Sequence, residues 1–267
     1  MKIYRYLYQV TAPSRTGLAW FDLIEIFLVV IGFLLYFLVR GAVVDREELA
    51  LQNARWIIEL QQSIGIWIEP SINEWVLEHG LLVRFFNFVY FWLDFPLIVF
   101  VGLVLFWRRR TFYRLLRDAL LISGGFALLV YWSIPVAPPR YIKEWGFVDT
   151  LKEYSDLAYQ AQSTAAFVNP YAAVPSLHVG WAIILTIVVF RTTRNGLLRA
   201  ASIATMVLQS ISVVATANHY LFDGVVGAGV CIVSLMIALW LQQSGYPRIR
   251  SWLHHRTDDR SLDFIEK

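Results

Sequence analysis

Six long apolar stretches constrain this chain more than any other feature of its sequence. They cover Leu18–Val39, Leu81–Phe106, Ala119–Ile134, Ser176–Phe190, Leu197–Ala217 and Phe222–Leu241. A helix needs roughly twenty apolar residues to cross the hydrocarbon core of a bilayer. Hydrophobic residues make up 58% of the 267 residues and charged residues 16%, which is too much apolar surface for a soluble domain. The sequence therefore predicts an all-α, polytopic membrane protein with six transmembrane helices.

The basic residues orient these helices. Sixteen of the 23 Lys and Arg residues lie on the N-terminal arm, between spans two and three, between spans four and five, and on the tail. Cytoplasmic loops collect Lys and Arg, so we expect both termini in the cytoplasm of a cell (plasma or inner) membrane. The opposite side has more acidic than basic residues, among them Glu69 and Asp149. The pI near 9.0 is then explained by the basic residues of the cytoplasmic segments, and we expect no nucleic-acid partner.

Two long segments face outward in this topology. In Gly41–Gly80, apolar residues recur at helical spacing, at Ile57, Leu60, Ile64, Trp67 and Ile68. They predict an amphipathic helix, either on the outer membrane interface or packed across the ends of the spans. Pro135–Pro175 is too long for a plain connection and is rich in aromatic residues. We expect it to form an ordered, re-entering outer loop.

These features divide the chain into three parts. Residues 1–80 hold the first span and the outer amphipathic helix. Residues 81–242 form a helical core, and residues 243–267 form a cytoplasmic tail.

Two histidines lie at the outward ends of spans. His178 begins the fourth span, and His219 lies at the junction of the fifth and sixth spans. Asp223 follows His219 by four residues, so on a helix the two side chains share a face and can hydrogen-bond. A carboxylate that holds an imidazole fixes its tautomer, as in the Ser-His-Asp arrangement. Ionisable residues at membrane depth are costly, and we interpret these three as catalytic.

The ends of the third and fourth spans add phosphate-binding groups on the same side. Arg140, in Ala137-Pro-Pro-Arg140, offers a planar fork of donors that suits a phosphate. Pro175 precedes Ser176, so the amides at the start of the fourth span, Ser176 among them, form a candidate anion site.

These motifs resemble a known family. Pro175-Ser-Leu-His178 followed by His219-x-x-x-Asp223 is similar to the second and third signature motifs of the type 2 phosphatidic acid phosphatase superfamily. Within it, the Ala-Pro-Pro-Arg140 motif and the stretch from Asn53 to Glu69 resemble the branch of inositol phosphorylceramide synthases and related inositolphosphotransferases.

The sequence also departs from the superfamily motifs. Ser133 stands where the first motif has a lysine, Val213 where the third has an arginine, and Leu177 where the second usually has a glycine. Two of three expected phosphate-binding cations are therefore missing, which favours the transferase branch over a generic lipid phosphate phosphatase.

The resemblance implies a mechanism. His219, polarised by Asp223, would attack phosphorus and form a phosphohistidine, while His178 would protonate the leaving alcohol and then activate the acceptor. Arg140 and the amides of the fourth span would stabilise the transition state. It implies no cofactor and no metal, although the two histidines and the aspartate could in principle bind one.

A further polar group lies within the second span. Asn87, Tyr90 and Asp94 recur at helical spacing. They either hold this span to a neighbour or line a pocket for the headgroup or the acceptor.

Three classes of function remain open. The first is transfer of a phospho-headgroup, such as inositol phosphate, from an outer-leaflet lipid to an alcohol. The second is hydrolysis of a lipid or polyprenyl phosphate or diphosphate. The third, a transporter or scaffold, is disfavoured by the three intact catalytic residues, because transporters tend instead to place polar residues on broken helices at the midplane.

Overall fold

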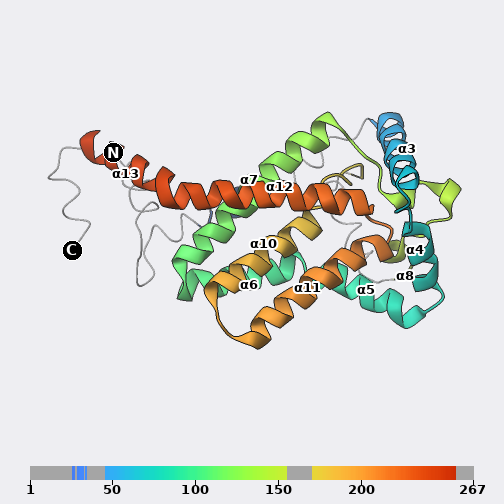
Figure 1. Ribbon diagram of the computed structural model, residues 1–267, viewed down its shortest axis with the longest axis horizontal. Coiled ribbons are helices and arrows are strands. Elements are labelled where there is room, and N and C mark those ends of the chain that lie inside the picture. Colours follow the sequence, from blue (N-terminus) through green and yellow to red (C-terminus); the bar gives the residue numbers. More distant parts are fainter. Residues whose placement is uncertain (1–25, 28, 33, 35–45, 155–169, 257–267) are drawn as a thin grey trace.

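The computed structural model describes residues 26–27, 29–32, 34, 46–154 and 170–256, and this part of the chain is helical without a β-strand (Figure 1). The bundle consists of α5 (Gly80–Trp92), α6 (Phe95–Arg108), α7 (Arg110–Ser133), α10 (Leu177–Thr192), α11 (Gly196–Ala215) and α12 (Leu221–Trp240). At one end lie α3 (Glu47–Ser63), α4 (Glu69–Leu77) and α8 (Thr150–Tyr154). At the other end, a π-helical turn (Leu241–Gly245) continues α12 into α13 (Tyr246–Arg256). The prediction of an all-helical fold is confirmed for the described residues.

Among these residues, three helices are long and apolar enough to cross a membrane. They are α7, α11 and the continuous helix Leu221–Trp252. The pair α5 and α6 makes a fourth span if it is counted as one, and α10 is apolar but shorter. The predicted first span, Leu18–Val39, falls almost entirely outside the described residues. The count of six spans stays a prediction.

The helix predicted over Leu81–Phe106 is not continuous. Helix α5 ends at Trp92, α6 begins at Phe95, and the chain bends by 40° between them. Pro96 explains the break, because a proline inside a helix lacks the amide N–H and clashes with the carbonyl one turn earlier. At the start of α6 it is accommodated. Asp94 thereby becomes the residue that precedes α6.

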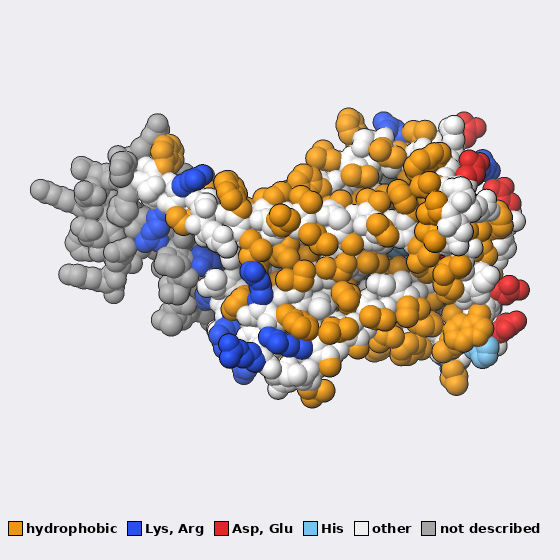
Figure 2. Space-filling model, in the orientation of Figure 1, with side chains coloured by type: hydrophobic (Ala, Val, Ile, Leu, Met, Phe, Trp, Pro, Cys, Tyr) orange, Lys and Arg blue, Asp and Glu red, His pale blue; other side chains and the backbone are white. Residues whose placement is uncertain are grey.

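The charged side chains separate to the two ends of the molecule. Figure 2 shows most of the visible Lys and Arg toward the end where α13 lies, Asp and Glu together with some Lys or Arg at the end of α3 and α4, and hydrophobic side chains between them. Exposed aromatic residues such as Phe88, Phe100 and Trp107 contribute to this apolar band. The distribution agrees with a bundle that spans a bilayer.

Helix α3 packs across the acidic end of the bundle. Its buried residues are Ala50, Ala54, Ile57, Ile58 and Gln61, whereas Ile64 is 60% exposed. Only part of the apolar stripe predicted from the sequence is therefore buried. Asn53 donates to the carbonyl of Pro135, and the carbonyl of Ala50 accepts from Ala137. The described parts of the outer loop thus lie against α3. Residues 155–169 lie outside the described residues, so the re-entering path stays a prediction.

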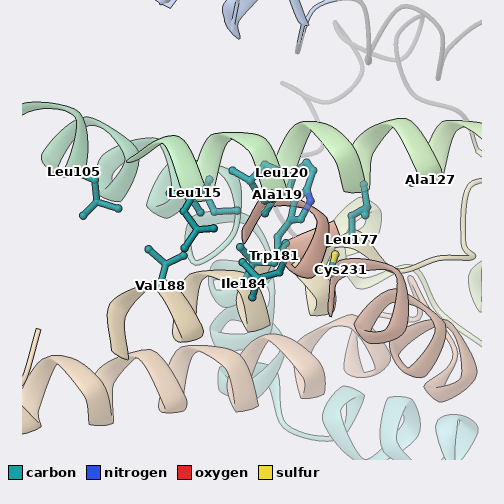
Figure 3. Close-up of a cluster of buried hydrophobic side chains, with 14 of the residues drawn as sticks. Leu105, Leu115, Ala119, Leu120, Ala127, Leu177, Trp181, Ile184, Val188 and Cys231 are labelled. Carbon is teal, nitrogen blue, oxygen red and sulfur yellow. The ribbon is translucent and has the colours of Figure 1, made fainter. Parts of the chain in front are cut away.

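Helices α10 and α12 pack closely in the centre of the bundle, where Trp181, Ile184 and Cys231 belong to the largest hydrophobic core cluster (Figure 3). Two glycines permit this contact. A Cβ at Gly227 would overlap the carbonyl oxygen of Ser176, and a Cβ at Gly180 would overlap the sulfur of Cys231. The close approach sets the positions of the starts of α10 and α12, at or beside which the two histidines lie.

We expect Gly227→Ala to destabilise the protein, because the new methyl group meets backbone that cannot move without separating α10 from α12. Overpacking of this kind costs about 1–3 kcal/mol. Gly229→Ala is the matched control, because it lies on the same helix with open space around it. Thermal unfolding in detergent measures both variants. Equal melting temperatures for the two would contradict this account of the contact.

Candidate active site

His219 lies in a buried turn between α11 and α12. Its Nδ1 is 2.8 Å from the carbonyl oxygen of Ala173 and 3.3 Å from Oδ2 of Asp223. Both oxygens accept hydrogen bonds, so Nδ1 carries the proton. The lone pair of the neutral ring is then on Nε2, the nitrogen that a nucleophilic histidine would use.

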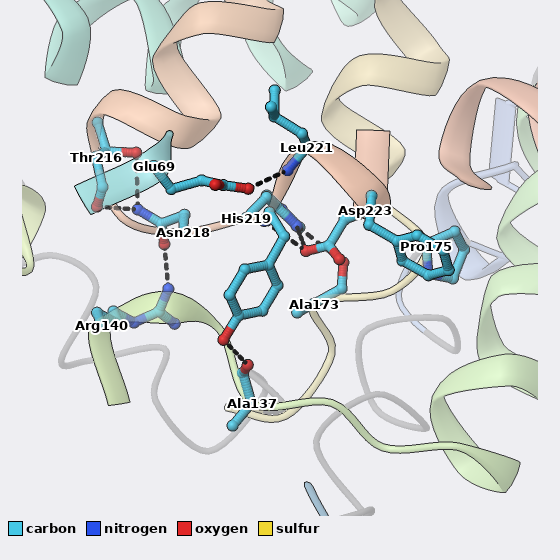
Figure 4. A network of polar contacts seen from close by, with 12 residues as sticks. Glu69, Ala137, Arg140, Ala173, Pro175, Thr216, Asn218, His219, Leu221 and Asp223 are labelled. Atoms are coloured by element: carbon cyan, nitrogen blue, oxygen red, sulfur yellow. Dashed lines mark hydrogen bonds and ion pairs between the residues drawn. The ribbon is translucent and has the colours of Figure 1, made fainter. Parts of the chain in front are cut away.

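Asp223 connects three parts of this region. Its carboxylate also accepts the backbone N–H of Tyr220 at 2.9 Å, and its own backbone carbonyl accepts the N–H of Ser176 at 3.0 Å (Figure 4). The residue is fully buried. One residue therefore joins the His219 turn, the start of α12 and the loop before α10.

His178 lies in the first turn of α10 and is held by a second carboxylate. Its Nδ1 is 2.8 Å from Oδ2 of Asp94. The amide nitrogen of Gln209 lies 3.2 Å from the same Nδ1, and the ring of Tyr90 packs on the imidazole with 4.3 Å between ring centroids. The two predicted histidines are thus each paired with an aspartate.

The two imidazole rings face a common cavity. Their centroids are 5.7 Å apart, and the cavity has a volume of about 210 Å³. Its walls are formed by Tyr90, Phe91, Asp94, Phe95, Pro96, Tyr131, Ala172, Leu177, His178, Trp181 and His219. No Lys or Arg is among the described residues that line it.

Arg140 lies beside the His219 turn and does not line the cavity. Its guanidinium donates to Oδ1 of Asn218 (Figure 4), and its Nε is 3.3 Å from Oδ2 of Asp149. Its backbone N–H donates to the carbonyl of Ala217, which has a φ of 54°. A non-glycine residue in this left-handed region is strained. Arg140 therefore supports the strained turn that leads into His219.

Ser176 is fully buried at the start of α10. Its backbone N–H is already bonded to the carbonyl of Asp223. This amide is therefore not available for the anion site that the sequence suggested. Its hydroxyl has no hydrogen-bond partner within the described part of the chain.

The three polar residues predicted along the second span separate. Tyr90 and Asp94 line the cavity. Asn87 does not; its amide nitrogen donates to the carbonyl of Thr150 at 2.8 Å, and its amide oxygen accepts the Thr150 hydroxyl at 2.7 Å. Asn87 therefore joins α5 to α8.

The family model described as PAP2 superfamily matches residues 55–237. The chain belongs to this superfamily. No curated protein and no solved structure matches the chain. The PAP2 family identifies the protein as an enzyme of the phosphatidic acid phosphatase-like type. Membership of its inositolphosphotransferase branch stays a prediction. In the described part of this PAP2 chain, no three His, Cys, Asp or Glu side chains are grouped so as to hold a metal ion.

The structure gives roles in the PAP2 core to two polar residues that the sequence analysis left without one. Glu69 and Gln61 are fully buried and hydrogen-bonded to each other. Glu69 accepts the N–H of Leu221, and Gln61 accepts the N–H of Phe222, both at 2.9 Å. They satisfy amides in the first turn of α12 that would otherwise lack partners. Both lie in the Asn53–Glu69 stretch that resembles the transferase branch, which was the sequence signal for them.

We expect Glu69→Ala to lower both stability and turnover. It leaves the N–H of Leu221 and the amide of Gln61 without an acceptor, at a cost of about 1–3 kcal/mol, and it loosens the helix start that carries Asp223. Glu69→Gln keeps an acceptor oxygen and should lose less stability and less turnover than Glu69→Ala. Glu74→Ala, at an exposed position of the same helix, is the control. If Glu69→Ala melts at the temperature of Glu74→Ala, the cap does not stabilise this region.

Proposed function

We propose that this PAP2 enzyme transfers a phospho-headgroup from a lipid phosphodiester to an alcohol through a phosphohistidine. The observation that carries the proposal is the pair of imidazoles across one cavity, each with its Nδ1 held by a carboxylate. Nucleophilic displacement in two steps needs one group that attacks phosphorus and one that moves protons, and this arrangement supplies both.

In the first step, Nε2 of His219 bonds to phosphorus as the bond to the lipid alcohol breaks. Nε2 of His178 gives its proton to the departing oxygen. In the second step, His178 takes a proton from the acceptor hydroxyl, whose oxygen bonds to phosphorus while the bond to His219 breaks. Asp223 stabilises the charge that develops on the His219 ring. With water as acceptor, the same steps amount to hydrolysis.

The charge of the cavity wall supports a phosphodiester donor. A phosphomonoester carries about −1.5 to −2 charges near neutral pH, and proteins commonly bind it with Arg or Lys. The described wall contains neither, and Arg140 is paired with Asp149. A phosphodiester carries a single charge and needs less compensation.

Two donors with identical acyl chains test the proposal. The purified protein, reconstituted with an alcohol acceptor, should transfer headgroup from phosphatidylinositol faster than it releases inorganic phosphate from phosphatidic acid. Mass spectrometry of the products separates the two outcomes. Faster cleavage of phosphatidic acid would favour a monoester phosphatase instead.

Substitution of the histidines tests their roles. His219→Ala should abolish trapped phosphoenzyme and lower turnover by roughly 10²-fold or more, because the nucleophile is gone. His178→Ala should lose turnover to a similar extent yet keep the nucleophile. His79→Ala is the control, because His79 is exposed and bonded to the carbonyl of Trp75. Phosphoenzyme that survives His219→Ala would place the nucleophile elsewhere.

The proposed orientation places the cavity on the outer side of the membrane. In a Cys231→Ser background, Lys152→Cys at an exposed site near the acidic end should react with an impermeant maleimide added outside intact cells. Arg194→Cys, on the turn between α10 and α11, should react only after permeabilisation. The opposite pattern would invert the topology.

A further inference from the structure

The break between α5 and α6 places a buried carboxylate against His178. Asp94 precedes α6, is 8% exposed, and has its Oδ2 at 2.8 Å from Nδ1 of His178. Pro96 enforces this break, because a proline cannot lie inside a helix without the loss of a hydrogen bond and a clash with the preceding turn. Irregular backbone at membrane depth is tolerated where it is buried in protein or lines a cavity, and Asp94 lines this one.

A structural role as interhelical contact fits Asp94 poorly. Its Oδ1 is buried and has no hydrogen-bond partner among the described residues, and a half-satisfied carboxylate is costly in an apolar setting. Asn87, two turns earlier on α5, shows what a structural polar residue looks like here, because both ends of its amide are bonded to Thr150.

We propose that Asp94 is the positioning residue for His178, as Asp223 is for His219. This inference rests on the proposed phosphotransfer function. The carboxylate keeps the proton of the ring on Nδ1, so that Nε2 is the atom that gives a proton to the leaving alcohol and takes one from the acceptor. Tyr90 packs on the ring from α5, and His219 faces it across the cavity. Asp94 itself forms no bond to phosphorus.

The test compares Asp94→Asn with His178→Ala, singly and combined, with phosphatidylinositol as donor. Asp94→Asn should lower kcat at least roughly 10-fold with little change in KM, because a neutral amide no longer favours one tautomer. Because Asp94 acts through His178, adding Asp94→Asn to His178→Ala should cost nothing further. The control is Asp118→Asn on α7, which removes a buried carboxylate bonded to Arg117 and to Tyr246 of α13, and it should keep its kcat.

A second donor separates positioning from general damage. When the lipid alcohol is replaced by p-nitrophenol, the leaving group departs without a proton. In single-turnover experiments with this donor, Asp94→Asn and His178→Ala should both lose less of the wild-type cleavage rate than they lose with the lipid donor. Additive losses in the double variant, or a loss in Asp94→Asn that is the same for both donors, would overturn the inference. A wild-type protein that cleaves neither donor would instead refute the proposed function.

Discussion

The carboxylate of Asp223 is the interaction on which the rest of the site depends. It is fully buried, and it binds both the imidazole of His219 and the backbone that starts α12. Its Oδ2 is within hydrogen-bond distance of both the His219 ring and the N–H of Tyr220, and such donors offset part of the cost of burying a carboxylate. The backbone of the same residue accepts from Ser176 and so fixes the start of α10. The distance between the two histidines therefore follows from the folding of a few residues around one carboxylate.

The outer helices complete this arrangement. Gln61 from α3 and Glu69 from α4 bind the first two amides of α12, and Asn73 from α4 donates to the carbonyl of Ala215 at the end of α11. The hydroxyl of Tyr220 donates to Ala137, and burial raises the pKa of this hydroxyl, so it stays a donor. The segment before the bundle is thus part of the support of the site, and the match of the PAP2 family from residue 55 includes most of it.

Local patterns in the sequence could predict the apolar helices and the paired residues His219 and Asp223, because both depend on spacing within one segment. The pairing of Asp94 with His178 joins residues far apart in the chain, and no periodicity encodes it. Pro96 was a readable signal for the break in the second span, but hydropathy over 81–106 concealed it. Arg140 was predicted from its chemistry to bind phosphate. Its contacts with Asn218 and Asp149 depend on tertiary structure that a single sequence does not reveal.

The close contact at Gly180 and Gly227 has a consequence for how this fold can diversify. Both histidines are anchored at helices whose backbones already touch, so the spacing of their backbones is set on one side of the cavity. The opposite wall, at Phe91 and Phe95, belongs to the bent pair α5 and α6, which also places Tyr90 and Asp94 against His178. Variation at Phe91 and Phe95 reshapes the cavity while the reacting groups stay in register. Chemistry and selectivity are therefore separated by residue and not by helix: a change at Phe91 or Phe95 alters the cavity, whereas a change at Asp94 between them alters the partner of His178.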